Sequence, residues 1–199
     1  MIHLVDLKIL YEKNQKLAVS IAFDYFKKME EQGLLKYYDI TGTIKNYIDF
    51  INFSLDKSGI CMLVWDMLRQ ESVAHVHLKD FEGYACRIHF NILRENHGLK
   101  AYDLAREVHE EVFSLRRKEN LQEPITSTLV GVTPTTNKAA CRFVKRFGYK
   151  ELAVLDRVCY SNEIKDYVPG MLTIMTENQF RGLYGYRKGR DKRVPGSGS

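Results

Sequence analysis

The fold is decided by one stretch of the sequence, residues 129–149, which reads LVGVTPTTNKAACRFVKRFGY. Its first four residues are apolar or glycine and are typical of a strand, which the Thr-Pro-Thr-Thr run then breaks. Asn137 is a residue type that opens helices, and the apolar residues after it recur at helical spacing until Gly148. The stretch therefore predicts a strand, a short turn and a helix that Gly148 ends, followed by a further strand.

The chain on the N-terminal side of this stretch divides into segments of clear period. An apolar face at helical spacing predicts a helix over 11–32, and Thr43 is a candidate cap for a second helix that runs to about residue 55. Alternation and strand-forming residues predict a first strand over 1–10 and then three consecutive strands over 60–65, 72–78 and 83–93, with a hairpin loop at 79–83.

A helix is expected after His97-Gly98, to about Arg117, followed by a strand over 125–132. The helix of the opening stretch covers 137–147, and a last strand covers 152–160. After Pro169 the pattern weakens.

Composition excludes several classes of protein. The 199 residues are 45% hydrophobic and 28% charged, which is typical of one globular domain. The four cysteines are widely separated, so we expect reduced core residues, no metal site and a cytoplasmic location. Charges interrupt the N-terminus, so we expect no signal peptide, and no apolar run is long enough for a membrane span.

The formal net charge of +5 is concentrated in residues 181–193. This segment carries six positive residues and one negative, and the remaining chain carries 24 of each sign. The body therefore lacks the overall basic charge of a nucleic-acid-binding domain. The basic tail, with Tyr184 and Tyr186 interleaved, could by itself pair with phosphates and stack on bases.

The 129–149 stretch resembles the second conserved segment of the GNAT superfamily of N-acetyltransferases, and the order of the expected elements is similar to that of the family. The resemblance implies an α/β fold over residues 1–165, with a mixed, mostly antiparallel central sheet that is flanked by helices. The sheet would splay between its fourth and fifth strands, here 83–93 and 125–132. Residues 166–194 would form a C-terminal extension with the basic tail, and 195–199 read as a Gly/Ser linker outside the fold.

The resemblance implies acetyl-CoA as the cofactor. Its pantetheine arm would add to the backbone of the fourth strand, and its pyrophosphate would lie on amides at the next helix start. The usual glycine pattern is incomplete at that start, because a register on Gly98 puts Glu95 and Lys100 at motif positions and a shifted register puts Leu99 at a glycine position. The expected cofactor-binding residues are Leu93, Arg94, His97, Gly98, Leu99, Lys100, Ala101, Asn137, Lys138 and Arg142.

The catalytic groups are less defined than the cofactor site. His89 lies on the strand expected to carry the thioester site, and an imidazole with an ordinary pKa suits a general base. Glu82, in the hairpin loop, is the second candidate, while His75 and His77 are interpreted as sheet residues rather than metal ligands. The family often places a tyrosine, which protonates the leaving thiolate, where this chain has Val144.

These observations predict an N-acetyltransferase that moves an acetyl group to an amine of a small molecule or a protein. Two alternatives remain open. One is a GNAT-fold protein without catalysis, structural or viral, located in the host cytoplasm or the virion. The other is a binding module that uses the basic tail. The oligomeric state, dimer included, cannot be read from the sequence.

Overall fold

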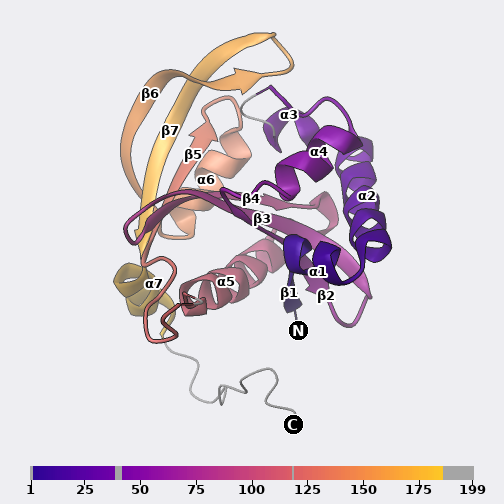
Figure 1. Cartoon of the computed structure of the whole chain (residues 1–199). Helices are drawn as coiled ribbons and strands as arrows, with labels where there is room; N and C mark the ends of the chain where they lie inside the picture. Colours follow the sequence, from indigo (N-terminus) through magenta and orange to yellow (C-terminus); the bar gives the residue numbers. More distant parts are fainter. Residues whose placement is uncertain (1, 39–41, 118, 186–199) are drawn as a thin grey trace.

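The computed structural model describes residues 2–38, 42–117 and 119–185, which form one seven-stranded sheet with helices on both faces (Figure 1). The strand order is β1-β2-β3-β4-β5-β7-β6, and every neighbouring pair is antiparallel except β4 and β5. The strands are β1 (Ile2–Asp6), β2 (Ile60–Asp66), β3 (Glu71–Glu82), β4 (Ala85–Ile92), β5 (Thr128–Pro134), β6 (Lys150–Ser161) and β7 (Asp166–Thr176).

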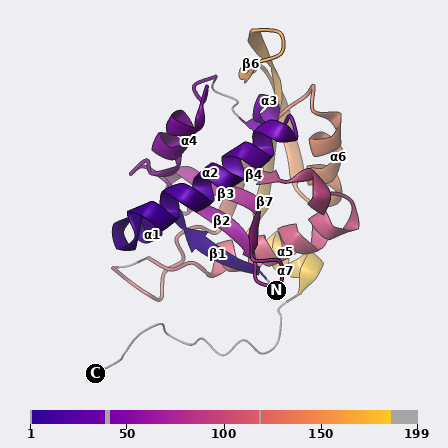
Figure 2. The ribbon, with the colours of Figure 1, turned by 90° about the vertical axis from the view of Figure 1, so that its right-hand side faces the viewer.

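The described residues also form seven α-helices and one 3-10 turn, of which the last helix follows the final strand. They are α1 (Leu7–Lys13), α2 (Gln15–Glu31), α3 (Leu35–Tyr38), α4 (Tyr47–Ser54), the 3-10 turn Arg94–Asn96, α5 (Leu99–Ser114), α6 (Lys138–Arg146) and α7 (Glu177–Tyr184). Helices α1 to α4 cover one face of β1 to β4, and α5 covers the other (Figures 1 and 2).

Alternation along the central strands divides the core between the two faces. Val76 and Leu78 of β3 pack into the cluster that contains Val108 and Val112 of α5. His75 and His77 alternate with these residues, point the other way and contact aromatic rings of α2, α3 and α4. The face toward α2 and α4 therefore carries a polar row within an apolar shell.

Several boundaries differ from the sequence predictions, and local capping explains two of them. The strand expected over 1–10 ends at Asp6, because the Asp6 carboxylate accepts from the backbone N–H groups of Lys8 and Ile9 and starts α1. The second helix starts at Tyr47 and not after Thr43, because Asn46 provides the cap. The third strand extends through Glu82, well past the loop expected from residue 79.

The C-terminal part was the least predictable. Residues 166–176 form β7, which lies between β5 and β6, so the sheet continues past residue 165. Arg181, the first residue of the basic segment, belongs to α7 and pairs with Glu177 at 3.2 Å. The other five basic residues of the predicted tail, and Tyr186, lie outside the described residues. No helix in the described part of the chain is long and apolar enough to cross a membrane.

Candidate cofactor-binding and active site

The parallel strands β4 and β5 separate along their length. Their pairing covers Ala85 to Arg87 of β4 and stops there. β4 continues to Ile92 paired only with β3, and β5 continues to Pro134 paired only with β7. The backbone of 88–92 thus faces the splay, where an extended ligand can add to it as a strand does. This confirms the predicted splay between the fourth and fifth strands.

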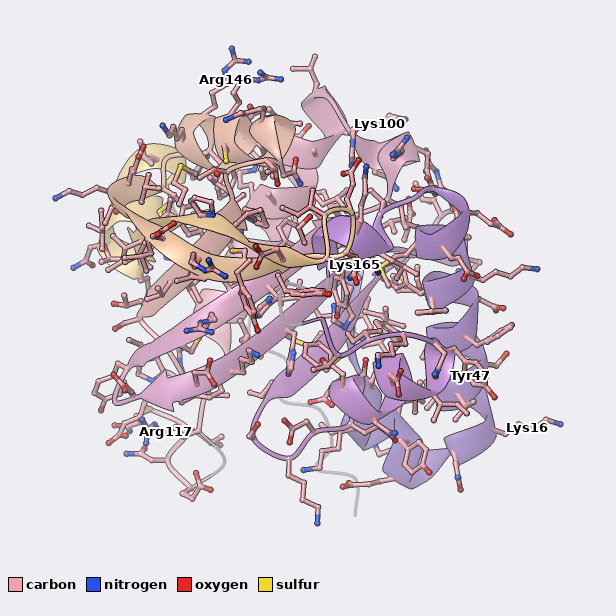
Figure 3. The ribbon with its side chains drawn as sticks, turned by 90° about the horizontal axis from the view of Figure 1, so that it is seen from above. Lys16, Tyr47, Lys100, Arg117, Arg146 and Lys165 are labelled. Atoms are coloured by element: carbon pink, nitrogen blue, oxygen red, sulfur yellow. The ribbon has the colours of Figure 1, made fainter. Side chains whose placement is uncertain are left out.

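A cavity of about 460 Å³ occupies the splay. Residues 88–92 of β4 and 131–134 of β5 form two of its walls, and the starts of α5 and α6 close a third side. Among the described residues that line it, none is acidic, whereas Arg142 and Arg146 are basic. The lining therefore favours an anionic ligand. Figure 3 shows Arg146 and Lys100 projecting on the same side of the molecule, away from Lys16.

The start of α5 lies at one end of this cavity. Gly98 precedes the helix with a φ of +79°, a conformation that side-chain-bearing residues rarely adopt. A Cβ added there would meet nothing within 4 Å, so the space above it is open. No side chain caps this end and no acidic residue lies in its first turn. Its amide groups and helix dipole are thus available to a phosphate.

The start of α6 also lines the cavity. The Asn137 side-chain oxygen accepts a hydrogen bond from the Ala140 N–H at 3.1 Å, which makes Asn137 a true helix cap. Asn137, Ala140 and Arg142 all line the cavity. The start of α6 thus brings the capping residue Asn137, the small residue Ala140 and the cation Arg142 to the same wall of the cavity.

The structure brings together some of the predicted site residues and separates others. His89, His97, Gly98, Ala101, Asn137 and Arg142 line the cavity. Glu82 does not, because it lies at the exposed end of β3, opposite Ala85 and beyond the closed end of the splay. The Leu93 side chain is fully buried in the core beneath α2. Arg94, Leu99, Lys100 and Lys138 are exposed around the cavity and do not line it.

His89 is the predicted base that the structure places in the cavity wall. Burial, and then the charge of Lys79, lower the pKa of its imidazole to about 3. The ring is therefore neutral at physiological pH, and the lowered pKa makes it a weaker base than the ordinary imidazole expected from the sequence. Its neighbour across the strands, His77, is also neutral, because burial lowers its pKa to about 4.

Sequence reasoning missed one pair in the cavity wall. The Tyr149 hydroxyl lies 2.7 Å from His109 Nε2, and His109 Nδ1 lies 2.7 Å from the Ala105 carbonyl oxygen. A carbonyl only accepts, so Nδ1 carries the proton and Nε2 accepts from the hydroxyl. Burial raises the pKa of Tyr149 and lowers that of His109 to about 4. The two residues are 40 positions apart, and no local pattern links them.

Val144, at the position where the family often has its acid, does line the cavity. It supplies no hydroxyl there. The phenol of Tyr149 lies in the same wall, with its proton engaged by His109.

Comparison with solved structures agrees with this architecture. The spermidine N-acetyltransferase of Vibrio cholerae, solved with CoA and spermine, superposes with a TM-score of 0.62 over 90% of this chain and 97% of that one, at 12% identity. The ribosomal-protein-S5-alanine acetyltransferase of Vibrio fischeri gives a TM-score of 0.60 over 90% and 93%, also at 12% identity. No protein-family model matches the sequence. No curated protein matches it significantly. The chain therefore has the fold of the GNAT acetyltransferases.

Proposed function

We propose that this protein is an acetyl-CoA-dependent N-acetyltransferase. The observation that carries the proposal is the β4–β5 splay, whose cavity joins an unpaired strand edge to an uncapped helix start at Gly98. A pantetheine arm can hydrogen-bond to the unpaired strand edge, and a pyrophosphate can bind the free amides of the helix start. A structural neighbour solved with CoA supports the same assignment.

The residues present fit this cofactor. The α5 amides after Gly98 would hold the pyrophosphate, and Arg142 and Arg146 would add charge-assisted contacts. The open edge of residues 88–92 would hold the pantetheine arm. Bound acetyl-CoA supplies an activated acetyl group.

The acceptor is proposed to be an amine of a small molecule or a protein. Its nitrogen lone pair forms the new N–C bond, the C–S bond breaks with its electron pair on sulfur, and one proton leaves the nitrogen. His89, which lines the cavity, is the proposed acceptor of that proton. Of the two neighbours above, one acts on the polycation spermidine. Because no carboxylate lines the described part of this cavity, its lining offers no opposite charge to the second ammonium group of a polyamine, and a monoamine or a protein amine is the favoured acceptor.

Calorimetric titration with acetyl-CoA and CoA tests the cofactor assignment. Arg142→Glu should weaken acetyl-CoA binding by about tenfold or more, because it removes a charge-assisted contact and adds repulsion. Lys16→Glu makes the same charge change on α2, away from Lys100 and Arg146 (Figure 3), and should leave the affinity within about twofold. An absence of binding at millimolar cofactor would refute the proposal.

A second candidate function rests on Val144. A cavity wall without the usual hydroxyl fits a GNAT-fold protein that binds a ligand or partner without turnover. Release of free CoA, measured with a panel of amines, separates the two functions. Sustained amine-dependent release favours the enzyme, and cofactor binding without release favours the second candidate.

A further inference from the structure

The open stretch of β4 presents two polar side chains to the same face of the sheet. His89 and Asn91 are alternate residues of this strand, so they point the same way, toward α2 and α4. Both line the cavity. No step of the proposed reaction uses Asn91.

The side chain of Asn91 is held from the α2 side. The Tyr25 hydroxyl donates to Asn91 Oδ1 at 3.0 Å and lies 3.2 Å from the Asn91 backbone oxygen. Tyr25 is fully buried, with an exposed fraction of 0%. Burial raises the pKa of its phenol well above the ordinary value, so the hydroxyl keeps its proton and remains a donor. Asn91 Oδ1 is therefore fixed toward α2.

The amide nitrogen of Asn91 is the end of the side chain that remains for a ligand. With Oδ1 turned toward Tyr25, Nδ2 points to the other side. Nδ2 donates to no group in the part of the chain that the structure describes, and it is not enclosed as Nδ2 of Asn96 is. It therefore reaches accessible space, and the space that Asn91 lines is the cavity. Its N–H groups can donate there to an oxygen of a ligand.

The face on which Asn91 lies is also the face from which an acceptor can approach. The backbone of 88–92 would hold a pantetheine arm in the plane of the sheet, so an acceptor has to approach from one face of the sheet or the other. On one face, Ile88 packs into the core cluster that contains Val108 of α5. On the opposite face, Leu34 lines the cavity together with His89 and Asn91. The acceptor therefore lies on the α2 face, within reach of both polar side chains.

The spacing of His89 and Asn91 matches that of an extended peptide. Alternate residues of a strand are about 6.6 Å apart along the strand. The terminal amine of an extended peptide and the carbonyl of its second residue are separated by a similar distance, because each residue spans about 3.3–3.6 Å. A peptide whose amine lies at His89 can thus bring a carbonyl oxygen to Asn91 Nδ2, whereas a simple alkylamine has no oxygen to place there.

We propose that Asn91 is a substrate-binding residue, which donates a hydrogen bond to a backbone carbonyl of the acceptor and so selects the α-amine of a protein N-terminus over amines without a carbonyl. This rests on the proposed acetyltransferase function. Tyr25 is a positioning residue, because it acts on the acceptor only through Asn91. The selection comes from hydrogen bonding and not from charge, since an acceptor without an oxygen leaves the Asn91 amide unpaired when it displaces water from the cavity.

Turnover of two small acceptors tests the selection, one being alanyl-alanine amide and the other n-hexylamine. Asn91→Ala should lower kcat/KM for the peptide by about tenfold, as expected for one lost hydrogen bond, and leave that for hexylamine within about twofold. Asn91→Asp keeps the size of the side chain, removes the donor and adds a carboxylate. It should therefore lower kcat/KM for the peptide and raise that for spermidine. Asn120→Ala makes the alanine change in an exposed loop and should alter none of these values.

A double substitution tests the positioning role of Tyr25. Tyr25→Phe keeps the ring and releases Asn91, so it should lower kcat/KM for the peptide by about threefold, less than Asn91→Ala does. Added to Asn91→Ala, the same substitution should not change the ratio of peptide to hexylamine rates any further, because its effect passes through Asn91. A general loss of stability would instead lower the rates with both acceptors.

Binding gives a readout that does not depend on turnover or on the folding of a variant. In calorimetry, the CoA-saturated wild type should bind the dipeptide amide more tightly than hexylamine, and the side-chain amide protons of Asn91 should shift in NMR spectra only with the peptide. Equal affinities, or an unchanged amide signal, would overturn the role of Asn91. So would a folded Asn91→Ala chain that keeps the peptide preference. A chain that binds the peptide through Asn91 but transfers no acetyl group would overturn the proposed function alone.

Discussion

The buried pair of Tyr149 and His109 gives the sharpest test of how the cavity wall is stabilised. Tyr149→Phe removes one hydroxyl and leaves the ring in place among Phe147 and His109. His109 Nε2, in a side chain only 2% exposed, then keeps its lone pair without a donor. Leaving a buried acceptor unsatisfied costs about 1–3 kcal/mol, more than the net value of an ordinary hydrogen bond.

The assay is urea unfolding at pH 7.5, where His109 is neutral in both folded and unfolded chains. We expect the free energy of unfolding to fall by about 2 kcal/mol with an unchanged m-value, and the Tm to fall by roughly 4–8 °C. Tyr84→Phe is the matched control, because Tyr84 is 46% exposed and the same hydroxyl deletion there should cost less than about 0.5 kcal/mol.

A double substitution isolates the pair. His109→Phe alone buries an unpaired Tyr149 hydroxyl, whereas His109→Phe with Tyr149→Phe removes both polar groups and should recover about 1 kcal/mol or more of the summed loss. A Tyr149→Phe chain as stable as the Tyr84→Phe control, or strictly additive losses in the double variant, would refute the reasoning.

Three further predictions follow from the same geometry. The pKa of His109 is lowered to about 4, so the unfolded chain takes up its proton first, and its contribution to stability should be complete only above about pH 7.5. Roughly 3 kcal/mol of this contribution should be lost as the pH falls to 4, measured as the difference between the wild type and His109→Phe in urea titrations across that range, because burial also lowers the pKa of His75, His77 and His89. Gly98→Ala should cost about 1–2 kcal/mol of stability, because its φ of +79° is left-handed, and should weaken acetyl-CoA binding in calorimetry; full affinity would contradict the assigned phosphate site. Asn137→Ala should lose about 1 kcal/mol of thermal stability whereas Asn137→Ser should not, and a loss of acetyl-CoA affinity in both variants would show that the amide contacts the cofactor as well as capping α6.

The sequence by itself determined the local elements around the site. Asn137 and Gly148 bound a helix because capping and left-handed backbone are properties of single residues, and both act at these positions in the structure. Gly98 marked the start of α5 for the same reason. Two nearby residues could each have capped the second helix, however. The helix starts after Asn46 and not after Thr43, in the register in which Tyr47 and Phe50 pack against Phe23 and Phe26 of α2.

Tertiary structure decided the features that depend on register between distant segments. β7 inserts between β5 and β6 and so pairs with the β5 wall of the splay, and no local pattern in its sequence indicates that place. Glu82 and His89 were both candidates on one hairpin, and only the point at which β4 leaves β5 puts His89 in the cavity and Glu82 outside it. The pairing of His77 with His89, and of His109 with Tyr149, likewise follows from strand register and helix docking. Spacing along a chain fixes periodicity and caps, whereas the contacts that form a site arise when separate elements bury their apolar faces against one another.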